Sequence, residues 1–395
     1  MKYESPALLP PGFQDLLPPD SDREAYLTRH IRDLFKSFGY RFVKPPLMEF
    51  EGSFTASWMG RGLSETTLRL MDPLSHSMLV LRADITPQIV RLARSRLPTA
   101  PRPLRLFYSA DSVRVQGGQI RTARQFTQIG CECIGLDNIE ADLEICILAL
   151  LSLKKLDLEN MTLDLAIPTL VPAILAGMKI DPARFDEIKK CLRQKNVRNL
   201  EMISADQRRV FEQLLASVGP ARTGLEDLSS MTHLPEPEHG NIKRLSELVE
   251  RLEAVIKTLE LEGITITIDP LETHGFDYHS GFGFTLFSND IQGELGRGGR
   301  YQAVFEASHD KQTHEEAGEP ACGFSLYTDN LRKLVERKGR PNRLSVPADI
   351  GWRELTKYQS EDWVVVRQIG GTKTDRELRE MGCTHKLDGK KIVEI

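Results

Sequence analysis

Three polar residues in one stretch of the sequence could do chemistry. Arg114, Gln128 and Glu132 belong to RLFYSADSVRVQGGQIRTARQFTQIGCECIG, residues 105–135. A guanidinium can bind a carboxylate or phosphate through paired hydrogen bonds, and amide and carboxylate oxygens accept from amine or imidazole N–H groups. Gln128 and Glu132 are four residues apart, so in a strand they point to the same face. Each residue alone could be an ordinary strand residue, and Glu132 could equally be solvated.

Patterns for other catalytic or metal sites are absent from the sequence. It contains no HExxH, no GxSxG and no convincing catalytic triad. No P-loop lysine and serine or threonine follow the glycine-rich segment 293–299. His274 and His279 lie five residues apart across a glycine, which favours a core or ligand-stacking role over a metal pair. The six cysteines form no CxxC pair and are expected to be free, buried thiols. We expect no catalytic residue, no metal and no cofactor.

The elements that carry these residues follow from the hydrophobic pattern. Asp20 or Ser21 can cap a first helix, which Gly39 ends. Short apolar runs alternate with polar segments from 78 to 135, as in an antiparallel sheet. A helix of about fourteen residues is expected to follow, from roughly Glu140.

Residues 182–263 differ in character, because charged amphipathic helices predominate and strand signals nearly vanish. Strand patterns return in ITITIDP and GFGFTLFS. The last 55 or so residues suggest a strand, a helix and a strand. We therefore divide the chain into a first core part (1–180), a helical insertion (181–263), a second core part (264–340) and a small C-terminal α/β segment (341–395).

Composition excludes several classes of protein. The net charge of −4 is small for 395 residues, and basic residues form no blocks, so strong nucleic-acid binding is not indicated. The N-terminus has no apolar signal region, and no stretch approaches the ~18 apolar residues of a membrane span. We expect a cytoplasmic protein without a membrane partner.

Several separated motifs resemble the class II aminoacyl-tRNA synthetases, and the histidyl enzyme in particular, over about residues 8–335. PPGFQDLLP resembles the opening segment, and GYRFVKPPLMEFEGSF, with Pro46 and Glu49, resembles the dimer-forming first motif. Residues 105–135 track the second motif, and LETHGFDYHSGFGF at 271–284 resembles the histidine-recognition motif. The resemblance implies an α+β fold: a synthetase-like antiparallel sheet flanked by helices, with a helical insertion and a short α/β C-terminal segment.

The resemblance also implies a histidine-binding site. Arg114 matches the arginine beside which the family places a nucleotide α-phosphate and an amino acid carboxylate. Asp84, Gln128 and Glu132 match positions around the substrate's ammonium and imidazole groups. The full expected set is Asp84, Thr86, Arg114, Gln128, Glu132, His274, Tyr278 and His279.

Departures from the family pattern predict that aminoacylation is lost. His274 stands where the ligases have an arginine, Gln116 and Gly117 replace a glutamate and a second arginine, and Asn330 replaces the arginine for the terminal phosphates. Removing one such donor typically slows a reaction by roughly 100-fold to 1,000-fold. The short C-terminal segment does not resemble the anticodon-binding domain, so no tRNA partner is expected.

This combination resembles the regulatory subunits of ATP phosphoribosyltransferase, including LRADITPQ and the ending GCTHKLDGKKIVEI. The resemblance implies a short-form catalytic subunit as partner, histidine as the feedback ligand, and a homodimer, formed around Pro46 and Glu49, within a larger hetero-oligomer. A divergent but active histidine-tRNA ligase and a scaffold with an empty site remain alternatives. Pyrophosphate exchange distinguishes the ligase, and calorimetry with histidine distinguishes the scaffold.

Overall fold

A computed structural model describes residues 8–117, 121–178, 180–197, 200, 203–273, 279–305, 318–335, 342–361 and 363–395. Contacts divide the chain into two units, Met1–Val335 and Glu336–Ile395. Within the described ranges, no helix combines the length and the apolar composition that a membrane crossing requires.

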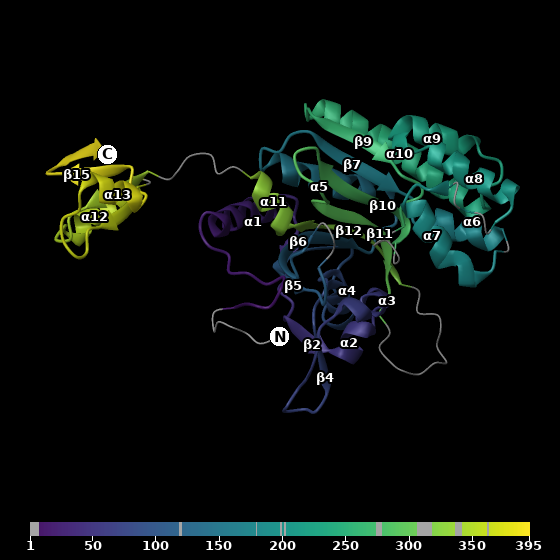
Figure 1. Ribbon diagram of the computed structural model, residues 1–395, viewed down its shortest axis with the longest axis horizontal. Helices are drawn as coiled ribbons and strands as arrows, with labels where there is room; N and C mark the ends of the chain where they lie inside the picture. Colours follow the sequence, from purple (N-terminus) through teal and green to yellow (C-terminus); the bar gives the residue numbers. More distant parts are fainter. Residues whose placement is uncertain are drawn as a thin grey trace. The chain divides into compact units, whose positions relative to one another are not determined.

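A nine-stranded sheet forms the centre of the first unit (Figure 1). Its strand order is β1-β5-β6-β12-β11-β10-β7-β9-β8, and neighbours are antiparallel except in the pairs β1–β5 and β7–β9. The mixed architecture with a large, mainly antiparallel sheet agrees with the expected fold class. The strands are β1 (Arg41–Phe42), β5 (Leu104–Val113), β6 (Gln125–Ile134), β7 (Met161–Ala166), β8 (Gly219–Pro220), β9 (Ile264–Ile268), β10 (His279–Ser288), β11 (Gly296–Ala303) and β12 (Glu319–Tyr327).

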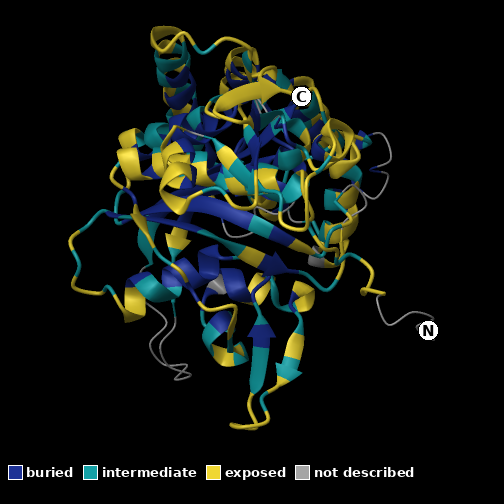
Figure 2. Cartoon of the chain, turned by 90° about the vertical axis from the view of Figure 1, so that its left-hand side faces the viewer, coloured by how far each residue is buried: buried dark blue, intermediate teal, exposed yellow. Residues whose placement is uncertain are grey.

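Alternation along the strands gives the sheet two different faces. Phe107 and Cys131 belong to the main hydrophobic core, which they share with residues of α1 (Asp20–Ser37) and α5 (Ile139–Lys154). Their neighbours Tyr108 and Glu132 are buried on the opposite face, because successive side chains of a strand alternate. Much of the sheet is accordingly dark blue in Figure 2, between more exposed surroundings.

The second face is covered by smaller elements. Helix α4 (Thr86–Ser95) packs there with Leu106, Tyr108 and Tyr301. Beside it lies a three-stranded sheet in the order β2-β4-β3. The remaining elements of this part are β2 (Met48–Phe50), α2 (Glu51–Thr55), α3 (Trp58–Gly62), the short 3-10 helix Ser64–Thr66, β3 (Arg69–Met71) and β4 (Met78–Leu81).

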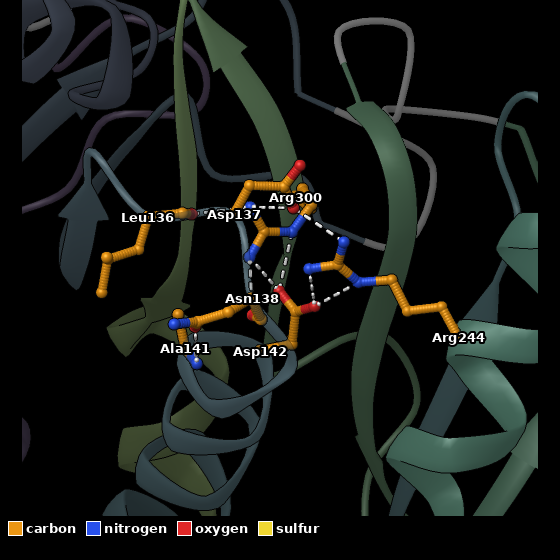
Figure 3. A network of polar contacts seen from close by, with 7 residues as sticks. All are labelled: Leu136, Asp137, Asn138, Ala141, Asp142, Arg244 and Arg300. Atoms are coloured by element: carbon orange, nitrogen blue, oxygen red, sulfur yellow. Dashed lines mark hydrogen bonds and ion pairs between the residues drawn. The ribbon is translucent and has the colours of Figure 1, made fainter.

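Helices between β7 and β9 pack at the β7–β9 end of the sheet (Figure 1). A buried ion network fastens the last of them to the core (Figure 3). Asp142 of α5 accepts from Arg244 Nε at 2.9 Å and from Arg300 Nε at 2.8 Å, so one carboxylate joins α10, α5 and β11. The elements are α6 (Leu170–Gly177), the 3-10 helix Pro182–Arg184, α7 (Phe185–Arg193), α8 (Ala205–Ala216), α9 (Ala221–Ser230) and α10 (Glu236–Thr258). The boundaries 181 and 263 stay a prediction from the sequence.

After α11 (Thr328–Leu334), which completes the first unit, the second unit has its own four-stranded sheet in the order β14-β13-β15-β16. Leu344, Val346, Tyr358 and Leu387 form its small core. The pattern predicted β14, α13 and β16 but missed half of the elements. They are β13 (Arg343–Val346), α12 (Trp352–Ser360), β14 (Val364–Arg367), α13 (Asp375–Glu380), β15 (His385–Asp388) and β16 (Lys391–Glu394).

Two local expectations need correction. Neither Asp20 nor Ser21 caps the first helix, because Pro19 is the N-cap residue and both lie inside the helix. The glycine-rich segment 293–299 leads into β11, and its residues 296–299 form the first half of that strand. All six cysteines are free thiols as expected, yet Cys191 is only half-buried because it lies in the outer helix α7.

Candidate functional site

Glu132 is the centre of a buried polar cluster on the second face of the sheet. Its side chain comes from β6 and is 1% exposed. One carboxylate oxygen accepts from the hydroxyls of Thr86 at 3.0 Å and Tyr108 at 3.2 Å. The other accepts from the hydroxyl of Tyr301 at 2.9 Å. Residues distant in the sequence, from α4, β5, β6 and β11, therefore meet at one carboxylate.

Burial dominates the ionisation of this carboxyl. Removal from water raises the pKa of Glu132 to about 8, although hydrogen bonds from Tyr301, Thr86 and Tyr108 act in the opposite direction. Asp84 contributes a further upward shift, because its negative charge lies nearby. A positive charge brought to this carboxyl would favour its ionised form.

Gln128 extends the cluster along β6. Its side-chain oxygen accepts from the backbone N–H of Ile85 at 3.3 Å and from the hydroxyl of Ser112 at 3.0 Å. Its amide nitrogen donates to the hydroxyl oxygen of Ser325 at 2.6 Å. Since Ser325 also bonds Tyr108 at 2.7 Å, Gln128 and Glu132 belong to one network.

Asp84 and Thr86 enter this network from the start of α4. The Asp84 carboxylate accepts from the backbone N–H of Thr86 at 2.8 Å, which fixes the first turn of the helix. Asp84 is half-buried, whereas Thr86 is buried beneath it. The Asp84 carboxylate thus remains accessible to a ligand, while the Thr86 hydroxyl supports Glu132.

Arg114 follows the last residue of β5, and its guanidinium lies 4.8 Å from the ring centroid of Phe126. Across the ranges that the structure describes, the Arg114 side chain donates no hydrogen bond to a protein acceptor. Phe126 lies two residues before Gln128 in β6, so both project from the same face. The cation is therefore available to an anion on the face that carries the cluster.

The structure places the other expected residues in different ways. His274 and Tyr278 lie outside the described residues. His279 is buried at the start of β10, directly opposite Tyr301 of β11, so the two share a face. Pro46 and Glu49 lie apart from the cluster, in the segment that enters β2 and in β2 itself.

Four buried residues of the cluster were missed from the sequence, Tyr108, Ser112, Tyr301 and Ser325. Tyr108, Ser112 and Ser325 lie in strands that pair with β6, whereas Tyr301 lies in β11, which pairs with β10 and β12. Tyr108 and Ser112, for example, lie on the same strand as Ala110, which pairs with Gln128. Strand alternation could have found those two once the pairing was known, but pairing is not visible in one sequence.

Comparisons with known proteins identify the family to which the chain belongs. The family model for histidyl-tRNA synthetase matches residues 12–331. An ATP phosphoribosyltransferase regulatory subunit of Rhodospirillum centenum is 38% identical over 99% of this chain and 97% of its own length. The relative of that name from Rhodospirillum rubrum is 36% identical over 98% of this chain and 97% of its own.

Solved structures show the same fold. A Bacillus halodurans structure described as an ATP phosphoribosyltransferase regulatory subunit/histidyl-tRNA synthetase gives a TM-score of 0.79, with 22% identity over 96% of this chain and 97% of that chain. Histidyl-tRNA synthetase from Nostoc gives 0.72, with 14% identity over 98% of this chain and 91% of that one. From the family model and the relatives above 30% identity, the chain belongs to the histidyl-tRNA synthetase family and, within it, to the ATP phosphoribosyltransferase regulatory subunits.

Proposed function

We propose that this chain activates a short-form ATP phosphoribosyltransferase catalytic subunit, which carries out the first step of histidine biosynthesis, and lowers its activity when histidine binds. The main support for histidine binding is the position of Arg114. Its guanidinium has no hydrogen-bond acceptor among the described residues and lies on the same sheet face as the acceptors Gln128 and Glu132. An amino acid carries the complementary groups, a carboxylate and an ammonium.

Histidine matches these groups in detail. Its carboxylate pairs with Arg114, since guanidinium and carboxylate form paired hydrogen bonds. The ammonium faces the half-buried carboxylate of Asp84 and the region of Gln128. An imidazole N–H donates to Glu132, the buried acceptor on the same face. His274, Tyr278 and His279 complete the site in this proposal.

A regulatory role requires two conformations with different affinities for histidine. The test combines calorimetry with histidine, ATP–pyrophosphate exchange, and co-purification with a short phosphoribosyltransferase chain. We expect saturable histidine binding, exchange at the level of a control without protein, and a stable complex. Histidine-dependent exchange above that control would favour a ligase, whereas absence of histidine binding would favour a scaffold.

We also propose a homodimer that forms through β1, β2 and the segment around Pro46. Both strands are at edges of their sheets, where a second chain can add. Large apolar side chains are exposed there, including Phe42, Met48 and Phe50. The Glu49 side chain pairs with Arg91, yet Glu49 Oε2 is buried without a hydrogen-bond partner among the described residues. A donor from a second copy would satisfy it.

Sedimentation tests the dimer directly. Phe50→Glu places a charge on the proposed interface and should shift the protein towards the monomer. Leu74→Glu is the matched control, because it changes the net charge equally. Leu74 lies outside the proposed interface and is 90% exposed in the described chain. A wild-type monomer at micromolar concentration, or equal effects of the two substitutions, would contradict this interface.

A further inference from the structure

The charges of three arginines act on the buried Tyr327 beside the candidate site, and one of them, Arg121, lies over its ring. The Tyr327 hydroxyl is subject to the charges of Arg114, Arg121 and Arg297, and to the opposing charge of Glu294. Burial raises the pKa of Tyr327, Glu294 adds to that shift, and the three arginines oppose it. Several guanidiniums close together would be suited to a polyphosphate if they were free.

Arg121 is already occupied by carboxylates of the chain itself. Its Nε and Nη2 atoms donate to the two oxygens of Asp329, each at 3.1 Å, and Nη1 donates to Glu294 at 3.3 Å. The side chains of Arg121 and Asp329 are only 9% and 6% exposed. Such a buried, bidentate pair cannot release its cation to an external anion without leaving a carboxylate uncompensated.

The guanidinium of Arg121 also contacts two aromatic rings. It lies 4.6 Å from the centroid of Phe126 and 4.0 Å from that of Tyr327. Burial lowers the pKa of Arg121, but Asp329, Tyr327 and Glu294 outweigh this effect, and the net shift is upward. The planar cation is thus held by stacking and by charge.

Arg297 and Glu294, next to this pair, are also held by interactions within the chain. Arg297 pairs with Glu294, and Glu272 adds a further negative charge near Arg297. Asn330 donates to the backbone carbonyl of Glu294 at 2.9 Å, which fixes the main chain at that residue. Of the three guanidiniums, only that of Arg114 has no acceptor among the described residues.

We propose that Glu294 and Asp329 hold Arg121 as an internal counter-ion, so that this side of the site accepts one carboxylate at Arg114 and excludes nucleotide polyphosphates. The proposal rests on the histidine-binding function and extends it, because it makes the site respond to free histidine without regard to ATP. That property suits a subunit whose proposed partner consumes ATP.

The test is a gain of binding. Glu294→Gln with Asp329→Asn keeps the side-chain shapes and leaves Arg121 without its carboxylates beside Arg114. Calorimetry with ATP and with inorganic triphosphate should then show affinity about tenfold or more above that of the wild type. The matched control is Glu144→Gln with Glu319→Gln, which changes the net charge equally at the partners of Arg105 and Arg102. The control should bind these anions no better than the wild type.

Millimolar ATP should leave the histidine affinity of the wild-type chain unchanged within about twofold. Submillimolar ATP binding by the wild type, or equal anion binding by the double variant and its control, would overturn the proposal. If the double variant does not fold, Asp329→Asn alone and the wild-type measurements decide. If neither the wild type nor the double variant binds histidine but the double variant gains triphosphate binding, the proposed histidine function is wrong and the counter-ion proposal is supported.

Discussion

Gly323 of β12 lies directly opposite Glu132 of β6, and a side-chain carbon at position 323 would come within 1.8 Å of Glu132 Oε2. The carboxylate therefore lies across a strand position that has no side chain. This close approach explains how a buried carboxylate can lie flat against the sheet and still reach Tyr301 of β11.

Gly323→Ala should displace the Glu132 carboxylate, because the neighbouring backbone leaves no room for both groups. Overpacking of this kind costs typically about 1–3 kcal/mol. We expect lower stability in chemical denaturation and weaker histidine binding by calorimetry. Gly240→Ala in α10 is the control, since nothing lies within 4 Å of its added carbon. Equal behaviour of the two variants would contradict the steric argument.

Glu132→Gln should alter how stability depends on pH. Burial raises the pKa of Glu132 from 4.5 to about 8, so between these values the folded chain holds a proton that the unfolded chain has lost. This carboxyl therefore lowers stability as pH rises through that range. The amide does not titrate, so the stability of the variant relative to wild type should increase with pH, by up to about 5 kcal/mol. Urea unfolding across the range measures it, and a constant difference would refute the assignment.

Glu132→Ala should separate binding of histidine from activation of the catalytic subunit. An unmet charged hydrogen bond costs roughly 1–3 kcal/mol or more, so histidine affinity should fall about tenfold or further. The reconstituted transferase should stay active without histidine and need more histidine for inhibition. The measurement is an inhibition curve, with a check that the complex assembles. An unchanged curve would move the inhibitory site elsewhere.

Arg244→Ala should loosen the attachment of α10 to the core. Asp142 is fully buried and accepts from both Arg244 and Arg300, so the change leaves part of its hydrogen bonding unmet (Figure 3). We expect a loss of about 1–3 kcal/mol in the free energy of unfolding. Arg251→Ala is the control. Arg251 also lies in α10, but its ion pairs with Glu140 and Glu247 are exposed, so their loss should change stability little. Equal losses would show that burial of Asp142 is unimportant.

Hydrophobic patterns predicted the helices and strands of the first unit well, because the spacing of apolar residues in a helix or a strand can be recognised within a short segment. The expected helix from about Glu140 is α5, and GFGFTLFS lies within β10. The second unit was predicted less completely, since short half-exposed strands such as β13 and β15 give little periodic signal. Within the expected helical insertion, the glycine and serines of α9 weaken the helical pattern of that segment.

The candidate site was predictable only where motifs carried it. Asp84, Thr86, Gln128 and Glu132 were named from the sequence, and the structure brings them into one network. Tyr301 could not be assigned, because its contact with Glu132 spans 169 positions and depends on the strand order. The ion pair of Arg121 with Asp329 could not be predicted either, because the two residues are 208 positions apart in the sequence.

Adjacent residues of β11 serve opposite sides of the sheet: Arg300 holds Asp142 of α5, and Tyr301 holds Glu132. A one-residue deletion within β11 would exchange these orientations, because side chains alternate with a period of two. It would turn a guanidinium towards the site and a phenol towards the helices at the same time. Insertions and deletions can therefore be tolerated in the loops at either end of this strand. Within the strand, the register must be kept so that both the contact with Asp142 and the contact with Glu132 are retained.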